Sequence, residues 1–162
     1  MQVHRTTVYL PSPDATADRA RKIGAALRTG DVILLEGSIG AGKTHFARAL
    51  IQNLLDIPED VPSPTFTIVQ VYETGQGELW HADLYRLTST FELEEIGLSQ
   101  AFSDAICLVE WPDRLGEEVP DTALKLVFSA TDDDNARQLT AEWMDPKWTR
   151  IVKDVLDDQP KS

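Results

Sequence analysis

A glycine-rich stretch between residues 37 and 44 has the residue types that bind a polyphosphate. Its sequence, Gly37-Ser38-Ile39-Gly40-Ala41-Gly42-Lys43-Thr44, matches the pattern G-x-x-x-x-G-K-[ST] of phosphate-binding loops. Glycines accept positive φ angles and have no Cβ, so backbone N–H groups can approach phosphate oxygens closely. The lysine can reach the β- and γ-phosphates, and the threonine hydroxyl can bind Mg²⁺. We therefore expect a nucleoside triphosphate with Mg²⁺ and assign its binding to Gly37, Ser38, Ile39, Gly40, Ala41, Gly42, Lys43, Thr44 and His45.

Two acidic residues stand where a sheet can present them to that ligand. Asp83 comes late in the strand-like run 78–84, and Glu110 directly follows the apolar run 106–109. Open α/β sheets bind ligands at the carboxyl ends of their strands, and phosphoryl transfer needs a metal and a group that orients the nucleophile. Either acid can hold Mg²⁺ together with Thr44 or orient the attacking water, and the residues leave that division open. The plainer alternatives are a turn-capping Asp83 and a surface Glu110.

Further side chains near these segments can assist. Thr65 ends a proline-rich segment, 58–65, and its hydroxyl can approach Mg²⁺ or the γ-phosphate in the manner of a switch loop. His81 precedes the first acid at i, i+2 spacing, so we expect it to orient a carboxylate rather than to bind a metal. Trp111 either stacks on a ligand or partner or simply packs, and Arg86 and Arg114 either stabilise negative charge or occupy ordinary surface positions. The predicted catalytic residues are Lys43, Thr65, Asp83 and Glu110, and the predicted metal ligands are Thr44, Asp83 and Glu110.

The apolar pattern places these residues on alternating strands and helices. Residues 32–35 form an apolar, β-branched run before the glycine loop, and residues 44–55 have apolar side chains at helical spacing after it. Upstream, Ser12 can cap a helix that reaches about residue 27, with Ala20, Ile23 and Leu27 inward. The other elements expected are a strand at 6–10, a hairpin of 66–73 and 78–84, a helix at 91–96 broken at Gly97, a helical turn at 98–102, a strand at 105–109, a hairpin of 123–130 and 137–143, and a helix at 147–156. This order predicts an α/β fold, a single P-loop NTPase domain with a mixed parallel and antiparallel central sheet flanked by helices.

Size and charge limit the function classes. A chain of 162 residues with 42% apolar residues suits one domain over 1–162, with its core at about 6–156 and a flexible tail at 157–162. A formal charge of −12 argues against a protein that binds DNA or RNA unaided, because nonspecific affinity comes largely from Lys and Arg. The apolar runs are too short to cross a membrane and the first residues lack a signal-peptide pattern, so we expect a cytoplasmic protein. The single cysteine, Cys107, lies in an apolar run and is expected to be a buried thiol.

Four segments in this order resemble one family, the bacterial TsaE proteins of tRNA threonylcarbamoyladenosine biosynthesis, over about residues 11–116. The segments are the glycine loop, Ser63-Pro64-Thr65-Phe66, His81-Ala82-Asp83-Leu84-Tyr85-Arg86-Leu87 and Leu108-Val109-Glu110-Trp111-Pro112. The resemblance implies a Mg²⁺-dependent ATPase, slow alone, that hydrolyses ATP to ADP and so drives or resets a threonylcarbamoyl-transfer complex of TsaD and TsaB, with tRNA contacted only through those partners. It also implies phosphate and Mg²⁺ binding by Lys43 and Thr44, a switch role for Thr65, and metal and water roles for Asp83 and Glu110. His45 departs from the family, where Thr or Ser is common.

Three other readings of the same loop stay open. A small-molecule kinase would share the phosphate loop but would need an arginine-bearing lid, and the arginines here are scattered. A GTPase is favoured slightly by Asp113-Arg114-Leu115-Gly116, a D-x-x-G match, but the chain contains no N-K-x-D segment for reading guanine. A nucleotide-dependent assembly module, in which hydrolysis is incidental, fits the sequence as well. An experiment is therefore needed to distinguish ATP hydrolysis from phosphotransfer to another acceptor and from a role in assembly alone.

Overall fold

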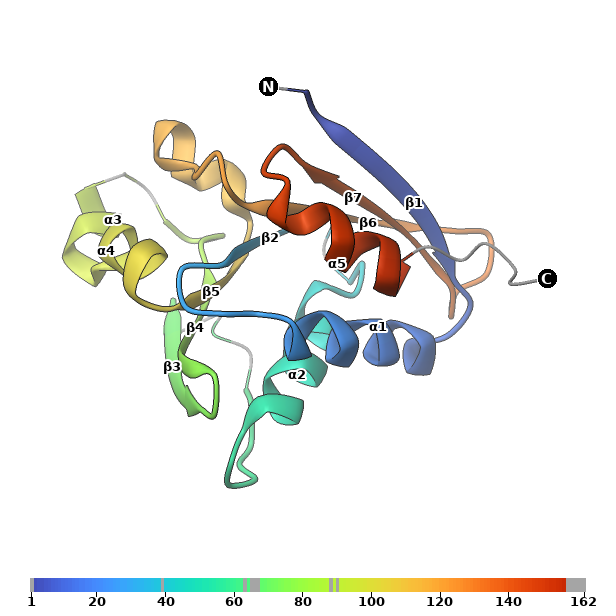
Figure 1. Ribbon diagram of the computed structural model, residues 1–162, viewed down its shortest axis with the longest axis horizontal. Coiled ribbons are helices and arrows are strands. Elements are labelled where there is room, and N and C mark those ends of the chain that lie inside the picture. Colours follow the sequence, from blue (N-terminus) through green and yellow to red (C-terminus); the bar gives the residue numbers. More distant parts are fainter. Residues whose placement is uncertain are drawn as a thin grey trace.

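A mixed sheet organises the protein, whose structure is a computed structural model that describes residues 2–38, 40–62, 64, 68–87, 89 and 91–156. The elements, labelled in Figure 1, are β1 (His4–Leu10), α1 (Pro13–Ala25), β2 (Val32–Glu36), α2 (Lys43–Leu54), β3 (Val69–Thr74), β4 (Gly77–Asp83), α3 (Phe91–Ile96), α4 (Leu98–Asp104), β5 (Ile106–Glu110), the 3-10 helix η1 (Pro112–Glu118), β6 (Leu124–Ala130), β7 (Arg137–Trp143) and α5 (Lys147–Leu156). Within the described residues the strands form one sheet in the order β1-β7-β6-β2-β5-β4-β3.

The centre of the sheet is parallel and its margins are antiparallel. Strands β6, β2, β5 and β4 run parallel to one another, whereas β3 pairs antiparallel with β4, and β7 pairs antiparallel with both β6 and β1. All five residues of β5 are buried, as are the first four of β2, because strands covered on both faces need apolar side chains throughout. The predicted α/β class with a mixed central sheet is confirmed.

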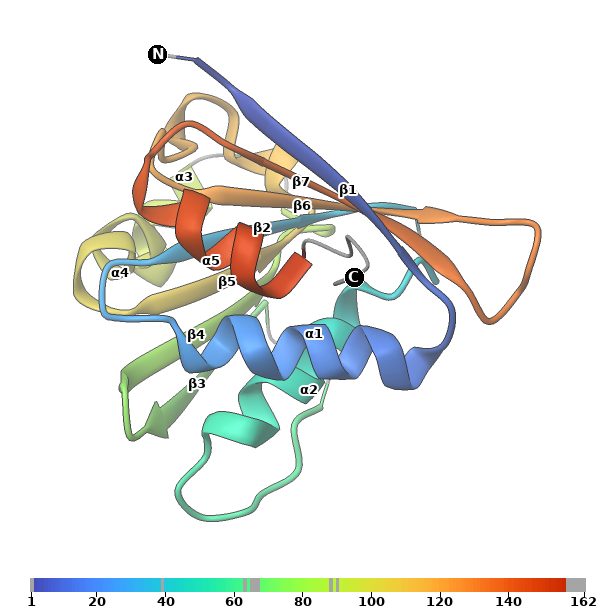
Figure 2. The same cartoon turned by 45° about the vertical axis from the view of Figure 1, so that its right-hand side comes forward.

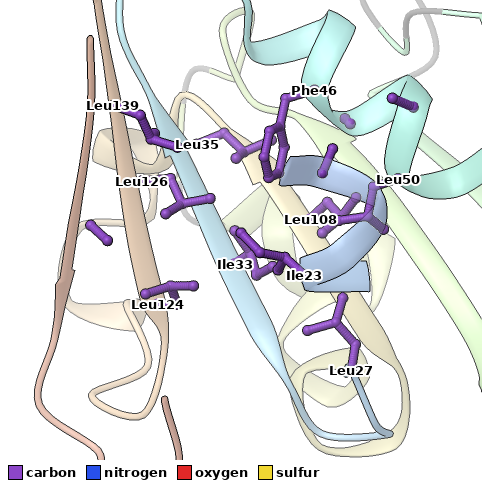
Figure 3. Close-up of a cluster of buried hydrophobic side chains, with 14 of the residues drawn as sticks. Ile23, Leu27, Ile33, Leu35, Phe46, Leu50, Leu108, Leu124, Leu126 and Leu139 are labelled. Atoms are coloured by element: carbon purple, nitrogen blue, oxygen red, sulfur yellow. The ribbon is translucent and has the colours of Figure 1, made fainter. Parts of the chain in front are cut away.

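Helices cover both faces of the parallel part (Figures 1 and 2). On one face α1 and α2 pack on the sheet around Ile33, Leu35 and Leu108 (Figure 3), while α5 packs on β1, β7 and α1. The same cluster also contains Ile23, Leu27, Phe46, Leu50, Leu124, Leu126, Leu139 and Trp148. On the other face α3, α4 and η1 contribute Leu93, Leu98, Ala101 and Leu115 to a second cluster with Val32, Leu34, Cys107 and Val109.

The predicted buried thiol is confirmed, and burial raises the pKa of Cys107 to about 12.

Helix α1 begins as predicted and packs closely on α2. The Ser12 hydroxyl accepts a hydrogen bond from the Ala15 N–H at 3.1 Å, and Pro13 occupies the first turn. Residues Ala20, Ile23 and Leu27 are all buried, although the helix ends at Ala25 and Leu27 lies just beyond it. A Cβ at Gly24 would lie 2.8 Å from Leu50 Cγ, so the glycine permits the close contact between the two helices.

Several predicted boundaries need adjustment. The first hairpin has a two-residue turn, Gly75-Gln76, and its first strand begins at Val69, three residues later than predicted; residues 65–67 lie outside the described part. Strand β5 runs through Glu110, so this acid ends the strand rather than following it. Helix α4 continues to Asp104, beyond the predicted turn. The predicted tail, 157–162, is also outside the described residues. Among the helices that are described, none combines the length and hydropathy needed to span a bilayer.

Candidate active site

The glycine loop connects the end of β2 to the first turn of α2, at the carboxyl end of the parallel strands. Gly37 has a φ of 146°, and a Cβ there would lie 2.7 Å from the Phe128 carbonyl oxygen, so only glycine fits. Gly42 has a φ of 109° at the N-cap of α2. The loop therefore turns sharply into a helix N-terminus, whose free N–H groups and dipole favour an anion. Ile39, one of the predicted nucleotide-binding residues, lies outside the described part of the chain.

Lys43 is a buried cation at this turn. Only 4% of the residue is exposed, and its Nζ donates a hydrogen bond of 2.6 Å to the Gly37 carbonyl oxygen. The same Nζ lies 3.4 Å from the centroid of a Trp111 ring, within the range of a cation–π contact. Burial lowers the pKa of Lys43 from its ordinary 10.5, and the nearby carboxylates of Glu110 and Asp83 oppose this change. The lysine is thus positioned at the loop at a cost in solvation.

Both predicted acids lie beside the loop. Asp83 and Glu110 end the neighbouring parallel strands β4 and β5 and are partners in their register. Glu110 is 2% exposed, so the alternative of a surface acid is wrong. Thr44 Oγ1 donates to Glu110 Oε1 at 2.8 Å, and His81 Nε2 lies 2.7 Å from Glu110 Oε2. The carboxylate of Glu110 is therefore in contact through both oxygens.

Asp83 also has a structural contact. Its Oδ1 accepts a hydrogen bond of 3.0 Å from the Tyr85 N–H, which is the turn-capping role named as the alternative. Asp83 nevertheless lines the same cavity of about 230 Å³ as Lys43, Thr44 and Glu110, with Gly40, Tyr85 and Trp111. One strand-end acid can cap a turn through one oxygen and still face a ligand, so the two roles are compatible.

The donors in this cavity suit Mg²⁺ that is shared with phosphates. In the part of the chain that the structure describes, no three His, Cys, Asp or Glu residues form a group able to hold a metal. Mg²⁺ usually binds through one or two carboxylates, phosphate oxygens and water rather than through a protein cage. A threonine hydroxyl next to two carboxylates fits that pattern, and Thr44, Asp83 and Glu110 are those groups.

Trp111 is part of the cavity wall. It has a left-handed conformation with φ 58° and ψ 53°, and its backbone N–H donates to the Leu35 carbonyl at 3.3 Å. Its ring packs on Tyr85, with 4.8 Å between the ring centroids, and also faces Lys43 Nζ. This positive φ turns the chain sharply after β5, so the half-buried indole packs against the second core cluster and also faces Lys43 of the phosphate loop.

The remaining predicted residues are divided among three places. Thr65, the predicted switch residue, is outside the described part of the chain. His45 is exposed on the outer flank of the loop, where its Nε2 lies 2.9 Å from the Pro13 carbonyl oxygen. It lines a second cavity of about 310 Å³ with Thr16, Gly40, Gly42 and others. Arg86 and Arg114 are exposed, and neither lines the cavity that contains Lys43.

One residue that the sequence did not identify contacts the loop directly. Arg137, at the start of β7, donates from Nε to the Ala41 carbonyl at 3.1 Å and from Nη2 to the Gly40 carbonyl at 3.2 Å. Its Nη1 donates to the carbonyls of Asp134 and Ala136, at 2.8 Å each. These contacts connect two carbonyls of the loop to β7. No local pattern signals this role, because Arg137 lies 96 residues from Ala41 and the contact depends on strand order.

Comparisons with known proteins cover the whole of this site. A family model described as threonylcarbamoyl adenosine biosynthesis protein TsaE matches residues 10–139. The chain is 38% identical over 130 residues to the tRNA threonylcarbamoyladenosine biosynthesis protein TsaE of Bacillus subtilis, which covers 80% of each chain. It is 34% identical over 134 residues to the protein of the same name from Rickettsia bellii, which covers 83% of this chain and 93% of the relative. The crystal structure of Bacillus subtilis YdiB is similar with a TM-score of 0.79 and 29% identity over 96% of each chain.

Proposed function

Because the chain belongs to the TsaE family of threonylcarbamoyl adenosine biosynthesis proteins, we propose that it is a Mg²⁺-dependent ATPase that supports this tRNA modification. Proteins of the family act in tRNA threonylcarbamoyladenosine biosynthesis. The observation that carries the ATPase assignment is the 2.8 Å contact between Thr44 Oγ1 and Glu110 Oε1. A glycine loop alone supports any nucleotide-binding role, whereas a loop joined to a buried acid supports hydrolysis.

Each residue has a distinct part in the proposed reaction. Backbone N–H groups of the glycine loop bind the phosphates, and Lys43 balances the charge that develops on the γ-phosphoryl group. Thr44 and Glu110, which already contact each other, would hold Mg²⁺. When bound, this ion neutralises negative charge on the β- and γ-phosphates. Asp83, across the same cavity, would orient the attacking water.

The proposed step is a simple hydrolysis. The water oxygen forms a bond to the γ-phosphorus as the bond to the β–γ bridging oxygen breaks, and ADP retains that oxygen. The water proton leaves toward the Asp83 carboxylate, and inorganic phosphate is the second product. No acceptor other than water is needed, which separates this reaction from that of a small-molecule kinase.

The charge of the chain supports a role through partners. With a formal charge of −12, the protein is a poor ligand for the phosphate backbone of tRNA. We therefore propose that it acts on TsaD and TsaB in the cytoplasm and that these partners contact the tRNA. The ATP dependence of threonylcarbamoyl transfer would then come from this chain.

The test follows the fate of the γ-phosphate. Radiolabelled ATP is incubated with the chain alone and with TsaD, TsaB and tRNA, and free phosphate is separated from labelled acceptors. We expect the label to appear as free phosphate, which forms slowly with the chain alone and faster with the partners. Label on a protein, nucleic acid or small molecule would favour a kinase. Binding without release of phosphate, with unchanged support of the partners, would favour the assembly module.

A further inference from the structure

His81 has a buried polar side chain that forms a hydrogen bond with Glu110. The residue is 0% exposed, lies in β4 and faces the side of the sheet that α2 covers. In the parallel register of β4 and β5, His81 is opposite Leu108, and Asp83 is opposite Glu110. The imidazole therefore reaches along the sheet toward the strand end, where its distal nitrogen, Nε2, lies 2.7 Å from Glu110 Oε2.

The direction of this hydrogen bond follows from the groups involved. A carboxylate oxygen accepts hydrogen bonds, so we infer that the proton lies on Nε2 and that the histidine donates it. The other ring nitrogen, Nδ1, is buried and has no hydrogen-bond partner among the described residues. A buried unpaired nitrogen costs stability, and a leucine or phenylalanine would fill the space without that cost. The polar contribution of this ring is therefore its contact with Glu110.

We propose that His81 is a positioning residue that fixes Glu110 Oε2 so that Oε1 is the working oxygen of the ATPase site. Glu110 Oε1 faces the Thr44 hydroxyl at 2.8 Å, on the side of the phosphate loop, while Oε2 faces His81 in the interior. A glutamate has three side-chain torsions, and two-sided contact restricts them. A histidine–carboxylate contact of this kind commonly orients the ligand of a metal. This inference rests on the proposed ATPase function.

Three variants test the donor. His81→Leu removes it, His81→Gln can keep an N–H donor near the position of Nε2, and Leu79→Val alters the same buried face of β4 two residues farther from the acids. We expect His81→Leu to lower kcat by about 10- to 100-fold, with the KM for ATP changed less than about threefold, as for other partners of metal ligands. His81→Gln should recover most of kcat. Leu79→Val should lower thermal stability and leave kcat unchanged.

Two outcomes of the kinetics overturn the inference. A kcat for His81→Leu equal to that of the wild type would mean that the contact has no role in turnover. Equal losses in His81→Leu and His81→Gln would mean that ring shape, not the Nε2 donor, matters. Binding of ATP without Mg²⁺ should stay within about threefold in both variants, because the phosphate loop is intact.

A spectroscopic measurement needs no activity. With ¹⁵N-labelled histidine, the Nε2 proton of His81 should appear far downfield, because a buried hydrogen bond to a carboxylate is short and charge-assisted. In Glu110→Gln the resonance should move upfield, while the ring ¹⁵N signals of His4, on the edge strand β1, serve as the control and should not move. Absence of the downfield resonance, or its persistence in Glu110→Gln, would overturn the contact. If the wild type releases no phosphate, the ATPase proposal fails and this signal still tests His81.

Discussion

Thr44 donates its hydroxyl proton to Glu110 Oε1 at 2.8 Å, although 66 residues separate the two in sequence. The contact follows from strand pairing. Strands β2 and β5 are parallel neighbours in which Leu35 is opposite Glu110, so the loop that leaves β2 enters α2 beside the end of β5. The register of two buried strands therefore determines how far the phosphate loop lies from its acid. Changes at Glu110 and at the residues around this contact should affect different measurable quantities.

The first prediction concerns Glu110→Gln. This variant keeps the shape of the side chain and removes its charge next to Thr44. We expect ATP binding without Mg²⁺ to be unchanged. The Mg²⁺ concentration that gives half of the maximal enhancement of ATP binding should rise by at least about tenfold, the lower end of the range for changes near a metal site. Titration of nucleotide binding against Mg²⁺ measures this. Glu117→Gln, an exposed acid on η1, is the matched control. An unchanged Mg²⁺ requirement would remove Glu110 from the metal site.

The second prediction assigns Asp83 to the water. Asn in place of Asp83 can still accept the hydrogen bond from the Tyr85 N–H, so the turn should persist. We expect Asp83→Asn to lower kcat by about 10²- to 10⁴-fold, the range of a lost general base, with the Mg²⁺ requirement unchanged. Steady-state phosphate release at several Mg²⁺ concentrations separates the two effects. If Asp83→Asn instead raises the Mg²⁺ requirement and Glu110→Gln does not, the two acids have exchanged roles.

The third prediction concerns the stability cost of Lys43. Because burial lowers the pKa of this amine below 10.5, the folded protein binds the proton more weakly than the unfolded chain. The cost is fully present below the lowered pKa and disappears as pH rises toward 10.5. We expect Lys43→Met to lose ATP binding but to gain about 1 kcal/mol in stability at pH 7, within the range of single stabilising changes. This corresponds to about 2–4 °C in Tm for a chain of this size.

Thermal unfolding at a series of pH values checks that prediction. The gain of Lys43→Met over the wild type should shrink between neutral pH and pH 10.5. Lys153→Met, which changes an exposed lysine of α5, should show neither the gain nor its pH dependence. A loss of stability in Lys43→Met at pH 7 would mean that the contacts of the amine with Gly37 and Trp111 outweigh its burial.

The fourth prediction concerns Arg137. Its guanidinium donates to the carbonyls of Gly40 and Ala41, and without it the loop would have to be ordered by the nucleotide itself. We expect Arg137→Met to raise the Kd for ATP by about 5- to 30-fold, equivalent to 1–2 kcal/mol, with a smaller effect on kcat. Arg150→Met, an exposed arginine of α5, is the control. Equal affinity in Arg137→Met and the wild type would show that the loop needs no such support.

Local patterns predicted much of the fold and part of the site. The bounds of β7 and α5 match the predicted ranges, because period-two and helical spacing are visible within a few residues. Glu110 could be placed because it follows an apolar run, and Asp83 because it comes late in a strand-like run. In contrast, the contact of Arg137 with the loop requires the β6–β7 hairpin to return beside β2, and periodicity does not determine strand order.

His81 lies between these cases. Its spacing indicated that it orients a carboxylate, but the acid it contacts, Glu110, is on the neighbouring strand and not on its own. Only the pairing of β4 with β5 and their register determine that partner. Likewise, a left-handed backbone conformation is usually predicted from a glycine, and position 111 is a tryptophan. The sequence therefore contains no sign of the turn that places the indole over Lys43.

The most direct test of the account is phosphate release from Mg²⁺-ATP by the wild type and Glu110→Gln, each with and without TsaD and TsaB. We predict slow release by the wild type, faster release with the partners, and a loss of at least about 100-fold in Glu110→Gln under both conditions, because electrostatic stabilisation of the transition state is lost. Equal release by the wild type and Glu110→Gln, or no release by the wild type with its partners present, would contradict the central claim that Thr44 and Glu110 form the core of an ATPase site.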